Sequence, residues 1–546
     1  MRWPFALLLL AAGMPGPAHA QAMRLAVNTH FDQNWPIATM DQVVAAGAQG
    51  IRDTITWGKV EQVPGHYGFT PANSGFAAQA CARKLPLLLT LTPHNKIYDG
   101  GETVFSAAGR QAFAAFAKAV ADRYPCLGAI EIGNEINDHS LRGRMLQQMP
   151  QSYVEIVSAV RAAVKPGHPD VALLSGSSLS VASGFFARLF SGGLMPLVDG
   201  IVVHPYVATP EQLPAQLERL RLAMAQAGGR KPVWASEFGF SPPSPELVPD
   251  YMIKMVTMLS AAQVVRADWY ALRDETFFPN SGIFKGPEAR PALDSFRLSV
   301  SRLLRSSNAQ RLDDGDPLSF VYRFGDGLYV VWGADRPIRW TSAAKAWDAR
   351  GRPLSPPDRL TDQPVIVETT SGFTLGAAAA LDDSLINFAG ASWRYAVEAA
   401  GSPPAPLDWV DWNWSPYLGT QRFPNFRAMP NAVSLGGRPG MPMALVERYA
   451  DGSAGPRWVS ACFETPAAKP ADVTIRAGDR TLFSAHVAGP VQTQALAVPQ
   501  GQAIEIRYAG IGNGQQVVRR RVRILAAPST APALCVPRGG SREDTP

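Results

Sequence analysis

Eight short apolar runs alternate with helical patterns in the front half of the chain, and this alternation restricts the possible folds more than any other feature. Apolar runs of this kind are typical of buried parallel strands, and the patterns between them are typical of connecting helices. Eight such units in about 280 residues predict an α/β fold, the (β/α)₈ or TIM barrel. The predicted strands are 24–28, 50–54, 86–91, 129–132, 171–175, 200–204, 233–236 and 267–272.

The rest of the chain has a different sequence pattern. The helical patterns, clearest at 110–124, 153–164, 210–227 and 246–262, give way after residue 305 to β-rich segments separated by Gly, Asp and Pro turns. These segments predict two β-domains, the second with the length of a β-sandwich. The predicted domains are a barrel at 21–305, a small β-domain at 306–372, a β-sandwich at 373–537 and a flexible tail at 538–546.

Residues 1–20 have the pattern of a secretory signal peptide. Arg2 gives a positive start, an apolar stretch follows, and Ala18-His19-Ala20 forms a small-x-small cleavage site. The apolar stretch is shorter than the roughly 20 residues that cross a bilayer. We therefore expect a secreted or periplasmic protein without stable membrane insertion.

Four cysteines would enter an oxidising compartment by this route, and their even number allows two disulfides. Two of them lie in the barrel and two lie near the C-terminus, so we expect the pairs Cys81–Cys126 and Cys462–Cys535. Free buried thiols remain the alternative, because connectivity does not follow from sequence alone. No Cys/His cluster has the spacing of a zinc site.

The composition excludes some classes of partner. Hydrophobic content of 46% and charged content of 18% are typical of an ordinary folded protein. The formal net charge is only +6, and no region has the dense Lys/Arg face that nucleic-acid binding requires.

Two glutamates, Glu135 and Glu237, each close a short apolar run, at the fourth and the seventh predicted strands. A carboxylate at the end of a buried strand is costly unless it is paired or used. In a parallel barrel that end of each strand opens into the active site. Two carboxyls in one such mouth are the groups that cleave a glycosidic bond, one as acid/base and one as nucleophile.

Several motifs surround these glutamates. Gly133-Asn134-Glu135 follows the fourth strand, Ser236-Glu237-Phe-Gly ends the seventh, and His204-Pro-Tyr206 follows the sixth. In these residues the chain resembles the clan A glycoside hydrolases, which carry the acid/base on strand four and the nucleophile on strand seven. The pattern covers the barrel, and it is most similar to family 39 and to bacterial exopolysaccharide endoglycosidases.

The resemblance implies a role for each matching residue. Glu135 would be the general acid/base and Glu237 the nucleophile, while Asn134 would hold the sugar 2-hydroxyl. Arg52 and Tyr206 would approach the nucleophile, because a cation and a phenol donor favour its charged form. Burial near apolar rings would keep Glu135 protonated until the bond breaks.

Other residues are candidates for contacts with the sugar. His94 and His204 follow strands and could bind hydroxyls, although a single histidine is often only a core residue. Trp269 is expected to offer a flat face to a sugar ring, with packing at the barrel mouth as the alternative. For Trp57 and Glu61 we expect mainly structural roles.

Two features of the C-terminal half invite functional interpretations. The stretch 409–417 contains Trp409, Trp412, Trp414 and Tyr417, which are consistent with a carbohydrate-binding platform or, as we favour, with packing inside the sandwich or its loops. The run at 519–523 contains four arginines, which could bind an acidic ligand. We favour a solvated strand face for this run.

Together these patterns predict a secreted, cofactor-independent retaining β-glycosidase that hydrolyses a polysaccharide or oligosaccharide by double displacement. An endo-acting exopolysaccharide hydrolase is one form of this prediction, and transglycosylation is a variant of the same chemistry. One alternative is a non-catalytic polysaccharide-binding or biofilm-matrix protein on a glycosidase-like barrel. A metal-dependent hydrolase is a second, but we see no convincing His/Asp ligand set and expect no metal.

Overall fold

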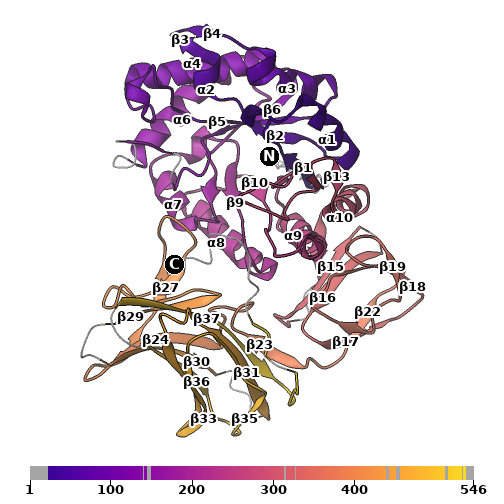
Figure 1. The fold of residues 1–546 in the computed structure, drawn as a ribbon, viewed down its shortest axis with the longest axis vertical. Coiled ribbons are helices and arrows are strands. Elements are labelled where there is room, and N and C mark those ends of the chain that lie inside the picture. The colour runs from indigo at the N-terminus through magenta and orange to yellow at the C-terminus, as the bar shows by residue number, and fades with distance from the viewer. Residues whose placement is uncertain are drawn as a thin grey trace, which may run out of the picture.

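The protein has three structural units, a barrel and two β-units that lie below it in Figure 1. The computed structural model describes residues 22–138, 141–143, 149–312, 315–325, 327–437, 442–450, 455–510, 514–531 and 533–535. The predicted signal peptide at 1–20 and tail at 538–546 lie outside these ranges. Among the helices within them, none has the length and apolar character needed to cross a membrane.

The first unit is the predicted (β/α)₈ barrel. Within the described residues, eight parallel strands pair in sequence order, with β1 and β11 adjacent. Leu174 of β7 forms a parallel bridge with Gly200, directly before β9, and so closes the ring. A short strand, β8 (Ser178–Leu179), adds to β9. The barrel strands are β1 (Arg24–Asn28), β2 (Ile51–Thr54), β5 (Leu87–Leu91), β6 (Leu127–Ile132), β7 (Ala172–Leu174), β9 (Ile201–His204), β10 (Val233–Phe238) and β11 (Arg266–Trp269).

Helices surround this ring, and local sequence signals define their ends. Thr70 and Asn73 form a reciprocal capping box at the start of α3. Gly47 ends α1 in the left-handed conformation (φ 73°), which glycine adopts without steric cost. The helices are α1 (Met40–Ala46), α2 (Trp57–Val60), α3 (Pro71–Ala82), α4 (Ala107–Arg123), α6 (Gln151–Val164), α7 (Ser183–Ser191), α8 (Leu213–Gln226), α9 (Val248–Ala261) and α10 (Ala292–Leu298).

The second unit is a small β-unit that begins with β14 and continues to β22, slightly past the predicted boundary at 372. It packs on the barrel, where the indole nitrogen of Trp332 donates to Glu211 Oε1 (2.8 Å). Lys254 of α9 also binds Glu211 (2.9 Å). Its strands are β14 (Ala309–Arg311), β15 (Ser319–Phe324), β16 (Leu328–Gly333), β17 (Arg336–Trp340), β18 (Ala344–Trp347), β19 (Pro353–Leu354), β20 (Arg359–Leu360), β21 (Val365–Thr369) and β22 (Phe373–Leu375).

The third unit is a β-sandwich with a shared apolar core between two sheets. One sheet is built around β31 and β37, and the other has the order β25-β24-β30-β36-β32-β33. Its strands are β23 (Ala380–Asp383), β24 (Trp393–Ala399), β25 (Ala405–Pro406), β26 (Asp408–Val410), β27 (Tyr417–Gly419), β28 (Arg427–Ala428), β29 (Ala432–Gly437), β30 (Met443–Tyr449), β31 (Arg457–Glu464), β32 (Ala471–Ala477), β33 (Arg480–Val487), β34 (Pro490–Gln492), β35 (Leu496–Val498), β36 (Ile504–Gly510) and β37 (Gly514–Leu525).

Both predicted disulfides are confirmed. Cys81 in α3 is bonded to Cys126, which directly precedes β6, and Cys462 in β31 is bonded to Cys535. The first bond therefore links a barrel helix to the strand that leads to Glu135. The second holds the end of the described chain against the sandwich.

The predicted solvated face of the arginine run is wrong. Arg520 is completely buried and binds Glu447 of β30, and Arg521 is also buried. Arg521 and Arg523 each donate to Asp383 of β23, at 2.8 and 2.9 Å. The run sits on β37, where Asp383 of the paired strand β23 and Glu447 of the facing sheet bind three of its four arginines. A sequence pattern could not reveal these partners.

Candidate active site

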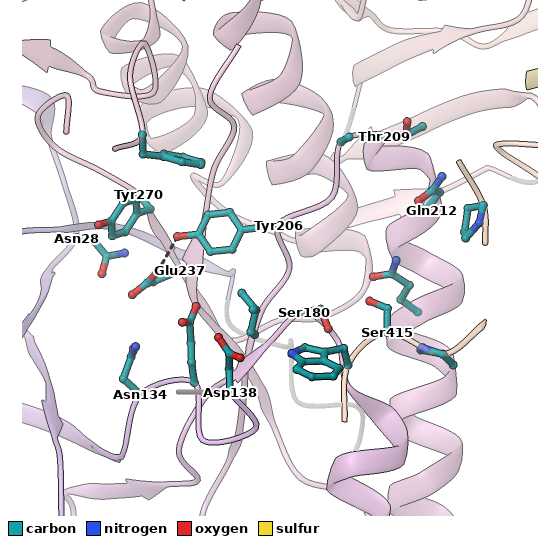
Figure 2. Close-up of a pocket in the computed structure, with 18 of the residues that line it drawn as sticks. Asn28, Asn134, Asp138, Ser180, Tyr206, Thr209, Gln212, Glu237, Tyr270 and Ser415 are labelled. Atoms are coloured by element: carbon teal, nitrogen blue, oxygen red, sulfur yellow. Dashed lines mark hydrogen bonds between the residues drawn. The ribbon is translucent and has the colours of Figure 1, made fainter. Parts of the chain in front are cut away.

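A cleft of about 1180 Å³ opens at the C-terminal ends of the barrel strands (Figure 2). Asn28 of β1, Asn134 after β6, Glu237 of β10 and Tyr270 after β11 all line it. The cleft continues to segments of the sandwich near residues 386–389, 409–417 and 427–431. It is thus formed by two units that are far apart in the sequence.

The two predicted catalytic glutamates face each other in this cleft. One carboxylate oxygen of Glu135, one of Glu237 and a ring nitrogen of His204 lie within 4.8 Å of one another. Retaining glycosidases hold their carboxyl groups about 5–5.5 Å apart, whereas inverting enzymes need about 6.5–9.5 Å to admit a water molecule. The measured proximity favours the retaining geometry.

The local backbone directs both side chains into the cleft. Glu135 has a positive φ of 43°, a conformation that is uncommon for a residue other than glycine. Its amide donates to Ser177 Oγ (2.9 Å), which helps to fix this turn. Glu237 lies where the pairing between β10 and β11 shifts register, and such bulges often redirect a side chain beside an active site.

Arg52 and Tyr206 contact Glu237, as the sequence predicted. Arg52 Nη1 donates to Glu237 Oε1 (2.5 Å), and the Tyr206 hydroxyl donates to Glu237 Oε2 (2.6 Å). Burial and the neighbouring Glu237 carboxylate raise the pKa of Tyr206 well above its ordinary value. Tyr206 therefore remains a phenol and a hydrogen-bond donor. Both oxygens of Glu237 accept a hydrogen bond, so the orientation of its carboxyl group is fixed.

A buried network fixes Arg52 in turn. Its Nε donates to Glu131 Oε2 (2.8 Å), and its Nη2 donates to Asn134 Oδ1 (2.7 Å). Its Nη1 also donates to Asn28 Oδ1 (2.9 Å). Burial acts to raise the pKa of Glu131, but Arg52 outweighs it and holds that pKa below the ordinary value. Glu131 therefore stays charged although it is completely buried.

Sequence reasoning did not identify Glu131 and Asn28 as part of the site. The available signal for Glu131 was an acidic residue in the middle of an apolar strand, Ile130-Glu131-Ile132. Such a residue needs a buried partner. Asn28, at the end of β1, also donates to the backbone oxygens of Ser236 and Asp268 (3.0 and 3.1 Å), so it ties three strands together beside Glu237.

His204 does not have its predicted sugar-binding role. The imidazole is completely buried and is not part of the cleft wall. Its Nδ1 lies 3.2 Å from Glu135 Oε1 and 3.5 Å from Glu237 Oε2, and its Nε2 lies 3.0 Å from Ser236 Oγ. The ring thus sits behind both glutamates and positions them.

Three other candidates also lie away from the cleft surface. Trp269 is completely buried, its indole nitrogen donates to the Ser281 oxygen (2.9 Å), and the predicted stacking on a sugar is wrong. His94 is partly exposed and is not among the residues that line the cleft. Trp57 is buried and donates to Glu61 (2.5 Å), in agreement with the structural roles expected for both.

Aromatic residues after β11 form one wall instead of Trp269. Tyr270, Phe277 and Phe278 line the cleft, and Tyr206 packs edge-on against Tyr270 and Phe278. His30 completes this wall, and its Nδ1 lies 2.8 Å from Glu275 Oε1. The chain therefore offers an aromatic surface beside Glu237. Tyr270, the residue after the predicted Trp269, contributes to this surface together with Phe277 and Phe278.

Trp412 and Trp414 do not pack inside the sandwich, which was one part of the role that we favoured, but they do pack on each other within the stretch 409–417. They are partly exposed, lie outside the buried core of the sandwich and line the cleft together with Tyr417. Trp409 is 41% exposed, and the guanidinium of Arg219 in α8 stacks on it at 4.1 Å. The stretch 409–417 runs from β26 through the connection to the first residue of β27 and lines the cleft opposite the barrel; we call it the loop 409–417.

The donor set of Glu135, His204 and Glu237 is also one that could bind a metal ion. In this structure, however, both oxygens of Glu237 accept hydrogen bonds, and the cationic Arg52 binds one of them. A divalent cation at this position would have to displace Tyr206 and approach a guanidinium. The residues present therefore fit an organic substrate better than a metal ion.

Neither the protein-family models nor the curated proteins include a match to this chain. Solved structures do match. A family 39 glycoside hydrolase from the gut symbiont Bacteroides cellulosilyticus WH2 aligns with a TM-score of 0.54 and 19% identity, over 64% of this chain and 81% of that chain. A family 39 β-xylosidase from Caulobacter crescentus aligns at 0.45 and 14% identity, over 64% of this chain and 98% of that chain. The first similarity shows that this chain shares the fold of a clan A glycoside hydrolase, the clan that its sequence resembles.

Proposed function

We propose that the protein is a retaining β-glycosidase with Glu237 as nucleophile and Glu135 as acid/base. The observation that carries this proposal is the proximity of the two carboxylates, within 4.8 Å, in a cleft at the C-terminal mouth of the barrel. The shared fold with a family 39 glycoside hydrolase supports it.

The proposed reaction has two displacements. Glu237 attacks the anomeric carbon while Glu135 gives its proton to the departing glycosidic oxygen, which leaves a glycosyl ester on Glu237. Glu135 then removes a proton from water, and this water cleaves the ester and regenerates both groups. Arg52 and Tyr206 hold Glu237 in position through its two oxygens. Asn134 lines the cleft beside Glu135, which supports the proposal that it binds the sugar 2-hydroxyl.

We also propose that the substrate is a polysaccharide or oligosaccharide outside the cytoplasm. A cleft of about 1180 Å³ exceeds the roughly 300–1,000 Å³ of typical small-molecule pockets, which supports a substrate longer than one sugar. The signal-like segment at 1–20 supports export. An endo-acting hydrolase of exopolysaccharide is the form that a long cleft and export favour.

Three measurements test this function. Glycan panels, including bacterial exopolysaccharides, are incubated with the protein and the product sizes are determined. NMR then follows the anomeric configuration of the first product, which retention predicts to match the substrate. A 2-fluoro glycoside of the sugar that is cleaved should give a covalent adduct on Glu237. Products of inverted configuration would rule out the retaining mechanism. Binding to glycans without any cleavage would favour the alternative of a non-catalytic matrix protein.

A further inference from the structure

The sandwich loop 409–417 shares the cleft with the two glutamates. Trp412, Trp414 and Tyr417 line the same cavity as Glu135 and Glu237. The rings of these three residues are only partly buried and do not belong to the sandwich core. Apolar side chains that remain partly exposed along a cavity often mark a binding surface.

Polar contacts hold this loop against the barrel. Arg219 of α8 binds Asp411 (3.1 Å), and Asn137 Nδ2 donates to the Asn413 backbone oxygen (2.5 Å). Gly184 of α7 permits the close approach, since a Cβ at that position would lie 2.3 Å from Asp411 Cβ. Asp411 and Asn413 thus attach the loop, while the tryptophans between and after them line the cavity.

The aromatic rings have a fixed arrangement before any ligand binds. Trp412 packs edge-on against Trp414 at 4.8 Å and against Tyr417 at 5.3 Å. The Trp412 indole nitrogen donates to the Ser415 oxygen of its own loop (2.7 Å), and Arg427 lies over Trp412 and Tyr417. Such a cluster offers rigid apolar surface to the C–H face of a sugar ring at little entropic cost.

The position of the loop also indicates which part of a glycan would reach it. Asn137, which holds Asn413, belongs to the same turn as Glu135, and its Oδ1 accepts from the Leu179 amide (2.8 Å). The loop therefore joins the cleft on the side of the proposed acid/base. The acid/base contacts the departing oxygen, so the chain on that side is the leaving group.

We infer that the loop 409–417 is a leaving-group subsite, in which Trp412 and Trp414 bind a β-linked glycan chain beyond the sugar that carries the departing oxygen. This inference rests on the proposed function for its direction along the chain. It makes the sandwich a part of the substrate cleft. The alternative is that the aromatic cluster only docks the sandwich on the barrel.

The test measures binding in the Glu237→Gln background, so that it does not depend on turnover. Matched disaccharides and hexasaccharides of the β-linked gluco, manno, xylo and galacto series are titrated by calorimetry. We expect at least one hexasaccharide to bind more tightly than its disaccharide. Replacing both Trp412 and Trp414 with Ala should reduce this advantage by about tenfold. Phe at both positions should restore most of it.

Trp347→Ala is the matched control. Trp347 is also partly exposed and stacks with an arginine, Arg302, at 3.7 Å, but it lies in the small β-unit away from the cleft. Its replacement should leave the length advantage unchanged. Thermal unfolding of each variant identifies any loss of fold.

Two results would overturn the inference. One is a length advantage that survives loss of both tryptophans, and the other is the absence of any advantage in every series. The test also separates the two proposals. Length-dependent binding that needs the tryptophans, in a protein that cleaves no glycan, would uphold glycan binding at Trp412 and Trp414 but refute the glycosidase and with it the leaving-group direction. Cleavage of a glycan without tryptophan-dependent binding would uphold the glycosidase and refute the subsite at Trp412 and Trp414.

Discussion

Two buried arginine–glutamate pairs, one in the barrel and one in the sandwich, have similar surroundings and different uses. Arg52 binds Glu131 in the barrel and Arg520 binds Glu447 in the sandwich, and no side chain of the four is more than 7% exposed. In both cases burial acts to lower the pKa of the arginine, and the neighbouring groups together, the paired carboxylate first among them, outweigh burial and raise it. Each guanidinium is therefore permanently charged.

The remaining hydrogen bonds of the two arginines differ. Arg520 donates to the backbone oxygen of Pro430 (2.6 Å), a residue of the cleft wall, and the Tyr508 hydroxyl donates to Glu447 (2.8 Å), so Arg520 holds no second carboxylate. Arg52 instead reaches a second carboxylate, Glu237, that lines a cleft. The comparison teaches that a buried ion pair can orient a reactive group when its arginine has a donor left for a second carboxylate in the cleft.

The largest expected effect is on catalysis, in Glu237→Gln. This variant keeps the size of the side chain but removes the nucleophile, so kcat should fall by about 10⁴-fold or more. Initial rates on the glycan identified by the panel measure the loss, and circular dichroism confirms the fold. A variant within tenfold of the wild-type rate would contradict the assignment of Glu237.

The second largest effect is a loss of stability, which we expect for the variant Glu447→Gln. It leaves the Arg520 cation buried without its carboxylate, which should lower the free energy of unfolding of the sandwich by about 3–5 kcal/mol. The rate per folded molecule should not change, because Glu447 lies outside the cleft. Urea unfolding gives the stability difference.

Glu505→Gln is the control for that experiment. Glu505 pairs with Arg448 on the same sheet, but the Arg448 side chain is 55% exposed. Exposed pairs contribute roughly 0.2–1 kcal/mol, so this variant should be nearly neutral. Equal losses in the two variants would show that the burial of the Glu447 pair has no special importance.

A smaller effect is expected from the phenols that cap the two carboxylates. Tyr206→Phe removes a hydrogen bond to the charged Glu237, and bonds of this kind contribute about 1.5–3 kcal/mol. We therefore expect kcat/KM to fall by about 10–100-fold, with little change in stability. Tyr508→Phe removes the corresponding bond to Glu447 and should affect stability alone. If both variants lower kcat/KM, or if both lower only the stability, the two phenols do not differ in the way that we propose.

The smallest effect concerns acid stability. The pKa of Glu131 is lowered in the folded state, so its stabilising contribution is present above its ordinary value of 4.5 and is lost as the pH falls below it. The barrel should therefore become less stable on acidification below about pH 4.5. Glu131→Gln should flatten this part of the stability profile, as measured by urea unfolding at several pH values. An unchanged slope would show that another group is responsible.

The sequence predicted the barrel well because its signals are local. Each strand is an apolar run, and Glu135 and Glu237 stand where such runs end, so the order of strands alone brings them together. The partners of Glu237 were also predicted, because the resemblance to clan A glycoside hydrolases implied that Arg52 and Tyr206 approach the nucleophile.

The errors arose where long-range packing decides the role of a residue. Trp269 and Tyr270 are neighbours on one strand end, and only the packing determines that the tyrosine faces the cleft. His204 follows a strand like the residues that face the cleft, but it lies behind the glutamates. Trp412 depends on how the sandwich docks on the barrel, which no local pattern encodes.

The close contact between Gly184 and Asp411 has a consequence for how this protein can evolve. Because Asp411 occupies the space where any side chain at position 184 would lie, a single codon change in a barrel helix would shift a loop encoded far downstream. Such a change would leave the acid, the nucleophile and their ion pairs intact. Under the proposed function, a substitution at position 184 would therefore alter the binding of the glycan chain without altering the groups that cleave it.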